Sequence, residues 1–429
     1  MKQKYSSYKD SGVEWIGQIP SHWEVRKFKF LFSEKKHTLN PNLGAGAISF
    51  GRVVFKKDEG IPEETKLSYQ EVLSGEFLIN PLNLNFDLKS LRIAKSEIDV
   101  VVSGGYIVLT LSKDNHKNYY KHLLYAFDIL QMKSLGNGVR QTISFGHLST
   151  ENLILPPNDE QIVISNYLDQ KTSQIDTLVS LTEKKIELLK EKRTSLINEA
   201  VTKGLDKTAK MKDSGVEWIG EIPIHWEIRP LKTITDVRPS NVDKHIYPDE
   251  IQVELCNYTD VYKNDFIDKR TPLKVGSCTE TEFSRFCLKK GDVIITKDSE
   301  TSDDIGIPCL ITEDLTNVVC GYHLTLLRPI SVVGGFLFRV FQTQYIKSYF
   351  ENESNGITRV ALGKSSIEST FIVYPPLPEQ QQIVDYINHH TSEIDKLISI
   401  EQRRIDTLKE YRQSLISEVV TGKVKVSNS

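Results

Sequence analysis

Cysteine, methionine and long hydrophobic runs are all scarce in this 429-residue chain. It has five cysteines and three methionines, and all five cysteines lie beyond residue 255. The cysteine spacing matches no zinc pattern, which predicts reduced thiols rather than a disulfide framework or a structural zinc. No apolar run approaches the roughly 18 residues of a membrane-spanning helix, and the opening MKQKYSSYKD lacks the apolar core of a signal peptide. We therefore expect a cytoplasmic protein with no membrane partner.

Positive charge is not in excess either. The chain has 54 lysines and arginines against 57 aspartates and glutamates, which gives a formal net charge of −3. Non-specific coating of nucleic acid depends on an excess of basic residues. The balance argues against that class of protein, but it permits a reader of base edges that shares its affinity with a partner. The length allows two or three domains.

Recognisable catalytic motifs are missing. We find neither a P-loop nor a nucleophile elbow. The run Asn80-Pro81-Leu82-Asn83 has a slight likeness to the catalytic loop of adenine methyltransferases, but it lacks the aromatic residue that grips a flipped base, so a turn is favoured. The histidines show no metal-ligand spacing, and His389-His390 are expected to point to different faces of a helix. We expect no catalytic residue and no metal in this chain.

What the chain does contain is an internal duplication with a period of about 200 residues. The phrase KDSGVEWIGQIPSHWEVR begins at Lys9 and KDSGVEWIGEIPIHWEIR at Lys212, with fifteen of eighteen positions identical. A second repeated phrase, PP-x-x-EQ, begins at Pro156 and at Pro375. We call these phrases segment A and segment B, and the stretch between them the x region. The period is too long for a solenoid repeat and indicates a duplicated module with pseudo-two-fold symmetry.

The two x regions diverge in sequence but keep landmarks at matching places. Gly75 opens GEFLIN and Gly291 opens GDVIIT, and thirty residues later a second glycine-led apolar run follows in each copy. A helix is expected over Tyr119–Lys133, with a counterpart near Phe336–Phe350. Short β-rich runs bounded by turn residues predict strands at 76–80, 106–111, 292–296 and 323–327. Each x region is therefore expected to form a small α+β domain.

Each segment B is predicted to be one long helix. It begins after the double proline, where Pro378 suits a first turn, and ends near Gly204 or Gly422. An apolar heptad seam runs along both helices, with an arginine layer and a polar layer, Thr182 and Glu401, at matching places. Antiparallel packing is favoured because it relates the two copies by a two-fold axis. The predicted interface consists of Leu168, Ile175, Val179, Ile186, Leu189, Leu196, Ile387, Ile394, Ile398, Ile405, Leu408 and Leu415.

Loops after the glycine landmarks, and the residues after two Asn-Gly turns, carry side chains of the types that can contact bases. Amide, lysine and carboxylate groups pair with base edges, and each well-placed bidentate contact discriminates by roughly 1–3 kcal/mol. The alternative for each is an ordinary solvated loop. The candidate DNA-binding residues are Asn80, Asn83, Asn85, Lys89, Arg140, Gln141, Lys297, Ser299, Thr358 and Arg359.

In combination, these motifs resemble the specificity subunit of type I restriction–modification systems. The resemblance rests on the two DSGVEWIG-x-IP-x-HWE phrases, the two PP-x-x-EQ starts and the T-S-x-I-D motif of each helix, and it extends from about Tyr8 to Val424. It implies an α+β fold: two small mixed α/β target-recognition domains separated by two long helices packed as an antiparallel coiled coil. The implied boundaries are 1–31 for an N-terminal conserved segment, 32–155 for the first recognition domain, 156–204 for the first spacer helix, 205–234 for a linker and the repeated segment, 235–374 for the second recognition domain, 375–422 for the second spacer helix and 423–429 for a tail.

The resemblance also implies a function. Each recognition domain would read one half of an asymmetric bipartite site on double-stranded DNA, and the helices would set the gap and dock two modification subunits. Those methyltransferase subunits would bind S-adenosylmethionine, and restriction subunits with motor and nuclease activity would join them. This chain would be non-catalytic and bind no cofactor itself. The alternative is a non-catalytic protein-interaction scaffold, a decayed or regulatory homologue; a free-standing enzyme is disfavoured by the missing motifs.

Overall fold

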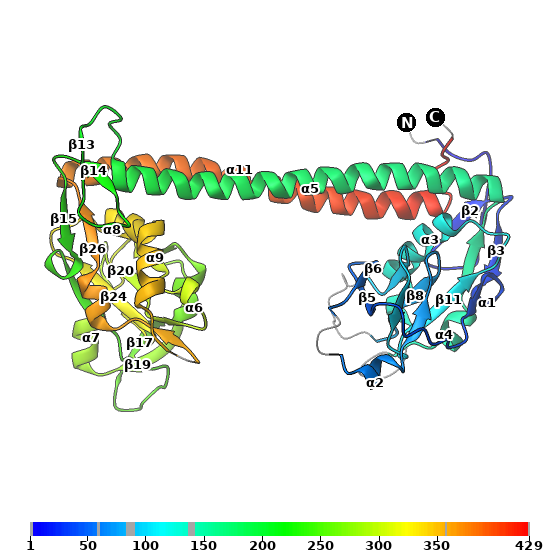
Figure 1. Ribbon diagram of the computed structural model, residues 1–429, viewed down its shortest axis with the longest axis horizontal. Helices are drawn as coiled ribbons and strands as arrows, with labels where there is room; N and C mark the ends of the chain where they lie inside the picture. Colours follow the sequence, from blue (N-terminus) through cyan, green and yellow to red (C-terminus); the bar gives the residue numbers. More distant parts are fainter. Residues whose placement is uncertain (1–2, 58–60, 83–90, 136–141, 357, 428–429) are drawn as a thin grey trace. The chain divides into compact units, whose positions relative to one another are not determined.

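The computed structural model describes residues 3–57, 61–82, 91–135, 142–356 and 358–427. The chain folds as two compact units, the first made of Met1–Glu183 and Arg403–Ser429, the second of Lys184–Gln402. Each unit contains one segment A, one x region, the beginning of one long helix and the end of the other (Figure 1). Each compact unit therefore takes parts from both copies of the duplication.

The first unit is built on a four-stranded antiparallel sheet in the order β4-β11-β8-β9. Two antiparallel pairs, β5-β6 and β7-β10, belong to the same x region. The strands are β4 (Phe32–Glu34), β5 (Gly46–Ser49), β6 (Arg52–Phe55), β7 (Gln70–Val72), β8 (Phe77–Ile79), β9 (Ile93–Lys95), β10 (Val100–Val102) and β11 (Ile107–Leu111). The helices are α1 (Phe28–Leu31), α2 (Glu63–Lys66), α3 (Lys117–Leu130), η1 (Met132–Ser134) and α4 (Phe145–Ser149).

The second unit has a five-stranded sheet in the order β16-β24-β20-β22-β18, a three-stranded sheet β19-β17-β23 and the short pair β21-β25. The strands are β16 (Thr235–Pro239), β17 (Ile251–Cys256), β18 (Phe266–Ile267), β19 (Lys274–Cys278), β20 (Val293–Thr296), β21 (Asp298–Ser299), β22 (Pro308–Ile311), β23 (Val318–Cys320), β24 (Leu324–Pro329) and β25 (Val360–Ala361). The helices are η2 (Leu231–Thr233), α6 (Tyr258–Lys263), α7 (Glu280–Phe286), η3 (Ser302–Asp304), α8 (Gly334–Phe341), α9 (Gln344–Glu353) and α10 (Lys364–Ser369).

The two units repeat one topology despite their divergent x regions. The antiparallel order β4-β11-β8-β9 corresponds to β16-β24-β20-β22. Segment A forms a hairpin in each copy, and the strand after it pairs with the strand before the double proline. These pairs are β1 (Tyr8–Asp10) with β2 (Gln18–Pro20), β3 (Glu24–Lys27) with β12 (Asn152–Leu155), β13 (Met211–Asp213) with β14 (Glu221–Pro223), and β15 (Glu227–Pro230) with β26 (Phe371–Tyr374).

The landmark glycines mark a left-handed turn before a central strand. Gly75 has φ 85° before β8, and Gly291 has φ 88° before β20, which is backbone that favours glycine. The strands predicted from these landmarks are present as β8, β11, β20 and β24. α3 also lies where a helix was predicted, and it turns Tyr119, Leu123 and Phe127 into the core at helical spacing.

One helix prediction was wrong. The expected single helix over Phe336–Phe350 is two helices, α8 and α9, separated at Thr343. The backbone there is extended, with φ −75° and ψ 153°, and the buried Thr343 hydroxyl donates to the carbonyl of Val340 at 2.6 Å. Threonine competes for backbone hydrogen bonds in this way and favours a helix start over a helix interior.

The two long helices are α5 (Asn158–Lys203) and α11 (Leu377–Val420). Each ends just before a glycine at φ 74°, Gly204 or Gly422, the conformation that terminates many helices. In the first unit the start of α5 packs with the end of α11, and in the second the end of α5 packs with the start of α11. The helices therefore run antiparallel within each unit, as predicted.

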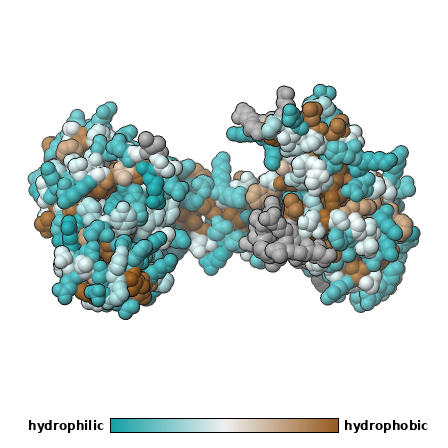
Figure 2. Space-filling model, turned by 90° about the horizontal axis from the view of Figure 1, so that it is seen from below, coloured by the Kyte–Doolittle hydropathy of each residue, from teal (hydrophilic) through white to brown (hydrophobic). Residues whose placement is uncertain are grey.

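The face shown in Figure 2 is mostly hydrophilic. In the face shown in Figure 2, hydrophobic residues form separate small patches among polar ones. Among the described helices, none is both long and apolar enough to cross a membrane. All five cysteines are free thiols, and burial raises the pKa of Cys278 to about 11. That direction disfavours the reactive thiolate form.

Candidate nucleic-acid interface and its helical frame

In the first unit, the Glu-Gln dipeptide of segment B ties the long helix to segment A. Glu160 Oε1 lies 2.5 Å from His22 Nε2, and Oε2 accepts hydrogen bonds from the Tyr5 hydroxyl at 2.8 Å and from Trp23 Nε1 at 3.1 Å. Burial raises the pKa of the Glu160 carboxyl, but these hydrogen bonds outweigh burial and hold that pKa below its usual value. The repeated His-Trp and Glu-Gln motifs are therefore structural partners.

The second unit repeats the histidine–glutamate contact of this junction, whereas Trp226 Nε1 is buried there without a hydrogen-bond partner among the described residues. His225 Nε2 lies 2.9 Å from Glu379 Oε2. The glutamine beside each glutamate, Gln161 or Gln380, is buried, and its amide donates to the carbonyl of the first proline of the pair at 2.9 or 2.8 Å. Its side-chain oxygen accepts the backbone N–H of the residue that caps α3 or α8, at 2.9 Å in both units. One dipeptide thus joins segment A, the long helix and one x-region helix, α3 or α8.

The seam arginines of the long helices form reciprocal ion pairs. In the first unit Arg412 Nε donates to Asp176 Oδ1 at 2.9 Å, and in the second Arg193 Nε lies 3.1 Å from Asp395 Oδ1. Each aspartate is the last residue of a T-S-x-I-D motif. Both pairs join the motif of one helix to the arginine of the other, an exchange that antiparallel packing allows.

The predicted coiled-coil residues line these helix pairs. Thr182 and Glu401 form the predicted polar layer of the seam: Thr182 is 5% exposed and donates to the carbonyl of Leu178 at 2.7 Å, and Glu401 is 6% exposed and lies 2.5 Å from Lys185 Nζ. The buried seam residues are Leu168, Ile175, Ile186, Ile387, Ile394, Ile405 and Leu415. The half-buried ones are Val179, Leu189, Leu196, Ile398 and Leu408.

In the second unit, two candidate DNA-binding segments are brought together. The segment after β20, which carries Lys297 and Ser299, pairs with the segment after the Asn-Gly turn through β21-β25. Thr358 and Arg359 are exposed next to this pairing. Candidates about 60 residues apart in the sequence thus meet at one place.

The side chains at this meeting point are not equally accessible. Lys297 Nζ donates to the carbonyl of Ser240 at 3.0 Å and lies 4.7 Å from the centre of the Tyr322 ring. Ser299 is only 3% exposed, so it could contact a base only if its surroundings opened. Arg359 is exposed, so its guanidinium is available for a base or phosphate contact.

Sequence reasoning missed His323 at the same place. Its Nδ1 lies 2.7 Å from Asp298 Oδ2, and its backbone carbonyl accepts the N–H of Lys297 at 3.0 Å. Its φ of 70° is in the left-handed region, which is uncommon for a residue with a side chain and concentrates at functional sites. The signal in the sequence was its position directly after the GY landmark.

The first unit has a matching contact between its two candidate segments. The N–H of Ile143 donates to the carbonyl of Pro81 at 3.0 Å, which joins the segment after β8 to the segment before α4. Asn80 is half-buried, and its Oδ1 accepts the N–H of Leu82 at 3.0 Å, which stabilises the turn predicted there. The remaining candidates lie outside the described residues: Asn83, Asn85, Lys89, Arg140 and Gln141.

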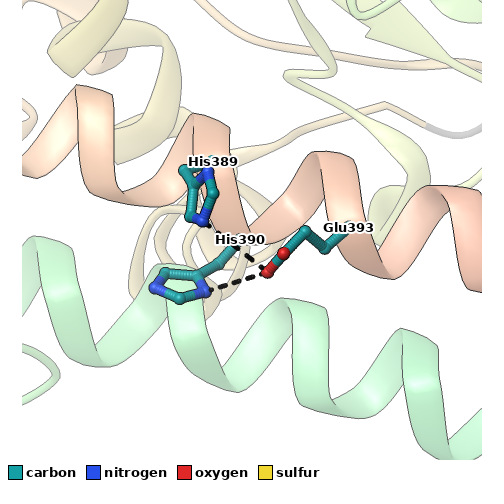
Figure 3. Close-up of side chains that lie close together, drawn as sticks. All are labelled: His389, His390 and Glu393. Atoms are coloured by element: carbon teal, nitrogen blue, oxygen red, sulfur yellow. Dashed lines mark ion pairs between the residues drawn. The ribbon is translucent and has the colours of Figure 1, made fainter.

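One group of possible metal ligands occurs among the described residues, on α11 (Figure 3). His389 Nε2 and His390 Nδ1 lie 3.8 Å and 3.5 Å from the same oxygen of Glu393, so the two rings converge on one carboxylate although they were expected to point to different faces. The side chains of His389 and Glu393 are 68% and 59% exposed. Ion pairs this accessible to water contribute little to stability.

A repeated frame that carries two divergent α+β domains defines an internally duplicated α+β protein. The family model described as type I restriction modification DNA specificity domain matches residues 89–191 and 224–410, which is more than half of the chain. The chain therefore belongs to the type I restriction–modification DNA specificity family, as its motifs suggested.

Two relatives resemble this chain along nearly its whole length, and one solved structure shares its fold. A Methanocaldococcus jannaschii protein assigned as the type I restriction enzyme MjaX specificity subunit is 24% identical, with 96% of each chain covered. The MjaVIII specificity subunit of the same organism is 23% identical, with 96% of this chain and 95% of the relative covered. A structure from work on assembly and conformational transition of the type I R-M system has a TM-score of 0.67 at 14% identity, over 94% of this chain and 98% of that one. This last likeness supports the fold.

Proposed function

We propose that each x region reads one half of an asymmetric, bipartite site on double-stranded DNA. The observation that supports this most directly is the repeated meeting of two candidate segments, at β21-β25 in the second unit and at the Pro81–Ile143 contact in the first. The frames around these places agree in motif and contact, whereas the x regions diverge. Divergent readers on a repeated frame suit two half-sites of different sequence.

The repeated frame suits two copies of one partner. The His-Trp and Glu-Gln junctions and the reciprocal Arg-Asp pairs recur in both units, so a surface that includes them is presented twice. We propose that two modification subunits dock there and that they bind S-adenosylmethionine and methylate adenine. Restriction subunits with motor and nuclease activity would join this complex. In this arrangement the chain recognises the DNA sequence and binds its partners, and the partners catalyse methylation and cleavage.

The long helices would set the gap between the half-sites. A base to be methylated must leave the helical stack, so the enzyme must approach the duplex at a defined place. Two readers on one face of DNA need centres roughly 34–36 Å apart, or a multiple of that distance. The helices are continuous over 46 and 44 residues, and a stiff connection of constant length would maintain such a phase.

The deciding experiment expresses the chain with its modification subunit in a host without adenine methylation and maps methylated adenines across the genome. The expected result is a two-part asymmetric motif with one gap length. A catalytically active complex that yields no such motif would refute the proposal and favour a protein-interaction scaffold. Inserting seven residues into both long helices at facing positions should change the gap and leave both half-sites unchanged.

A further inference from the structure

The β5-β6 hairpin of the first unit ends in an unusual turn. Its two central residues, Phe50 and Gly51, have φ values of 47° and 72°, and Ser49 pairs directly with Arg52. Two-residue hairpin turns with positive φ at both central positions strongly prefer Asn-Gly or Asp-Gly. Glycine suits the second position here, because a Cβ on Gly51 would lie 2.7 Å from Leu91 Cδ1. Phenylalanine at the first position is the residue that requires an explanation.

Phe50 gains no packing from this conformation. It is 95% exposed, so the left-handed backbone is not offset by burial of the ring. On the same hairpin, Val54 is 37% exposed and Phe55 is 61% exposed. Isolated exposed hydrophobic residues are ordinary, but a fully exposed aromatic ring on a strained turn is not.

The hairpin carries basic residues at both of its ends. Arg52 is 77% exposed and has an ion pair with Asp176 at 3.8 Å, a contact too long and too exposed to hold it firmly. Lys56 and Lys57 are exposed at the other end of the hairpin, where the Lys56 N–H donates to the carbonyl of Ala45 at 2.8 Å. The hairpin therefore combines an unsupported aromatic side chain at its tip with one basic side chain beside it and two at its base. That combination favours a polyanion with stacked rings over an apolar protein surface.

We propose that the β5-β6 hairpin is a wedge for double-stranded DNA, in which Phe50 inserts between two base pairs and Arg52 contacts a phosphate beside the opened step, while Lys56 and Lys57 contact phosphates farther along the duplex. This inference rests on the function proposed above and adds a second kind of recognition to it. Apolar side chains that enter a base step unstack and kink the duplex. The energy of that distortion depends on the step, so the wedge would favour easily unstacked steps without any hydrogen bond to a base.

The substitution Phe50→Asn separates the wedge from the turn. Asparagine tolerates the left-handed region, so the variant should unfold at the same or a higher denaturant concentration than the parent chain. Phe30→Asn is the matched control, because Phe30 is 64% exposed in the same unit but lies on α1. Phe50→Trp keeps a stacking ring at the tip and should retain the parent's affinity for DNA.

The experiment uses the full chain in complex with its modification subunit and a duplex that carries the mapped site. 2-Aminopurine is placed in turn at each position of the half-site read by the first unit, with the methylated adenine left out because base flipping also raises fluorescence. The parent complex and Phe50→Trp should brighten the probe at one step. Phe50→Asn should lose that signal and bind about 10-fold more weakly, as the loss of one aromatic–base stack predicts. Phe30→Asn should behave like the parent.

The outcomes separate the two proposals. If the parent complex does not bind the duplex, the proposed reading function fails and the wedge fails with it. If the parent binds but Phe50→Asn matches it in affinity and fluorescence, the wedge alone is refuted. If Phe50→Asn instead fails to assemble with the modification subunit, the hairpin is a protein-binding surface, which also overturns the wedge.

Discussion

Arg412 of α11 donates from Nε to Asp176 Oδ1 of α5 at 2.9 Å, in the seam where a heptad pattern calls for an apolar residue. Arg193 and Asp395 repeat the pair at 3.1 Å in the second unit. The arginine of each helix thus meets the T-S-x-I-D motif of the other. Because a one-heptad shift would leave both arginines without these partners, the pairs act as register marks for the antiparallel packing.

Reversing one of these charges should weaken the helix pair. Arg412→Glu places a second negative charge beside Asp176 and should lower the free energy of unfolding by about 1 kcal/mol, since the pair is partly exposed. Adding Asp176→Arg should restore most of the loss, as measured by denaturant titration. Lys409→Glu, at an exposed position of the same helix, is the control. A double variant no more stable than Arg412→Glu would contradict the register role.

The apolar seam should matter more than its charges. Leu168 is fully buried on α5, and Leu168→Ala should cost about 2–5 kcal/mol through lost burial and a residual cavity. Leu181 lies on the same helix but is 60% exposed, so Leu181→Ala should change stability by about 0.5 kcal/mol or less. Denaturant titration of both variants tests the assignment; equal losses would show that the seam is misplaced.

Acid should weaken the junction at Glu160. The pKa of this carboxyl lies below its unfolded value of 4.5. Its contribution to the free energy of unfolding is therefore complete above about pH 4.5 and is lost as the pH falls through the folded-state pKa. Glu160→Gln should therefore melt at a lower temperature than the parent near neutral pH. The difference in melting temperature should become smaller below about pH 4.5. Melting curves across that range provide the measurement, with Glu183→Gln as an exposed control on α5. A difference in melting temperature that does not change with pH would exclude the ionised carboxylate as its cause.

Arg359 should contribute to DNA binding by the second unit. It is exposed beside β25, and Arg359→Ala should weaken binding of the mapped site by about 10-fold if it makes one charged contact. Arg270→Ala is the matched control, because that side chain is 90% exposed on another loop of the same unit. The two complexes are compared by anisotropy titration at one salt concentration. Equal affinities would remove Arg359 from the interface.

Exchange of one reader should change one half-site. Replacing residues 32–155 by the matching region of another family member leaves both copies of segment B in place, together with the Arg-Asp pairs. Methylation mapping should then show one altered half-site, the other half-site retained and the same gap length. A change in both halves would rule out independent readers.

Several features were predictable because their cause is local. Gly75 and Gly291 mark turns that need left-handed backbone, and the β-rich runs after them became β8 and β20. The division of one expected helix into α8 and α9 was not predictable from periodicity. The apolar spacing continues through Thr343, whereas the buried hydroxyl of Thr343 ends the helix. The solvent exposure of individual side chains was not predictable either. Lys297 and Ser299 looked alike as loop residues, but Ser299 is buried where β21 pairs with β25.

By itself, the sequence determined the duplication, the two long helices, the seam and the family, because repeats, heptads and capping glycines are written in residues close together along the chain. Tertiary structure alone decided that each compact unit combines parts of both copies, that Glu160 meets His22, and that two distant loops share β21-β25. These contacts join residues tens to hundreds of positions apart. Their formation depends on burial and hydrogen bonding in the folded chain, which no local pattern encodes.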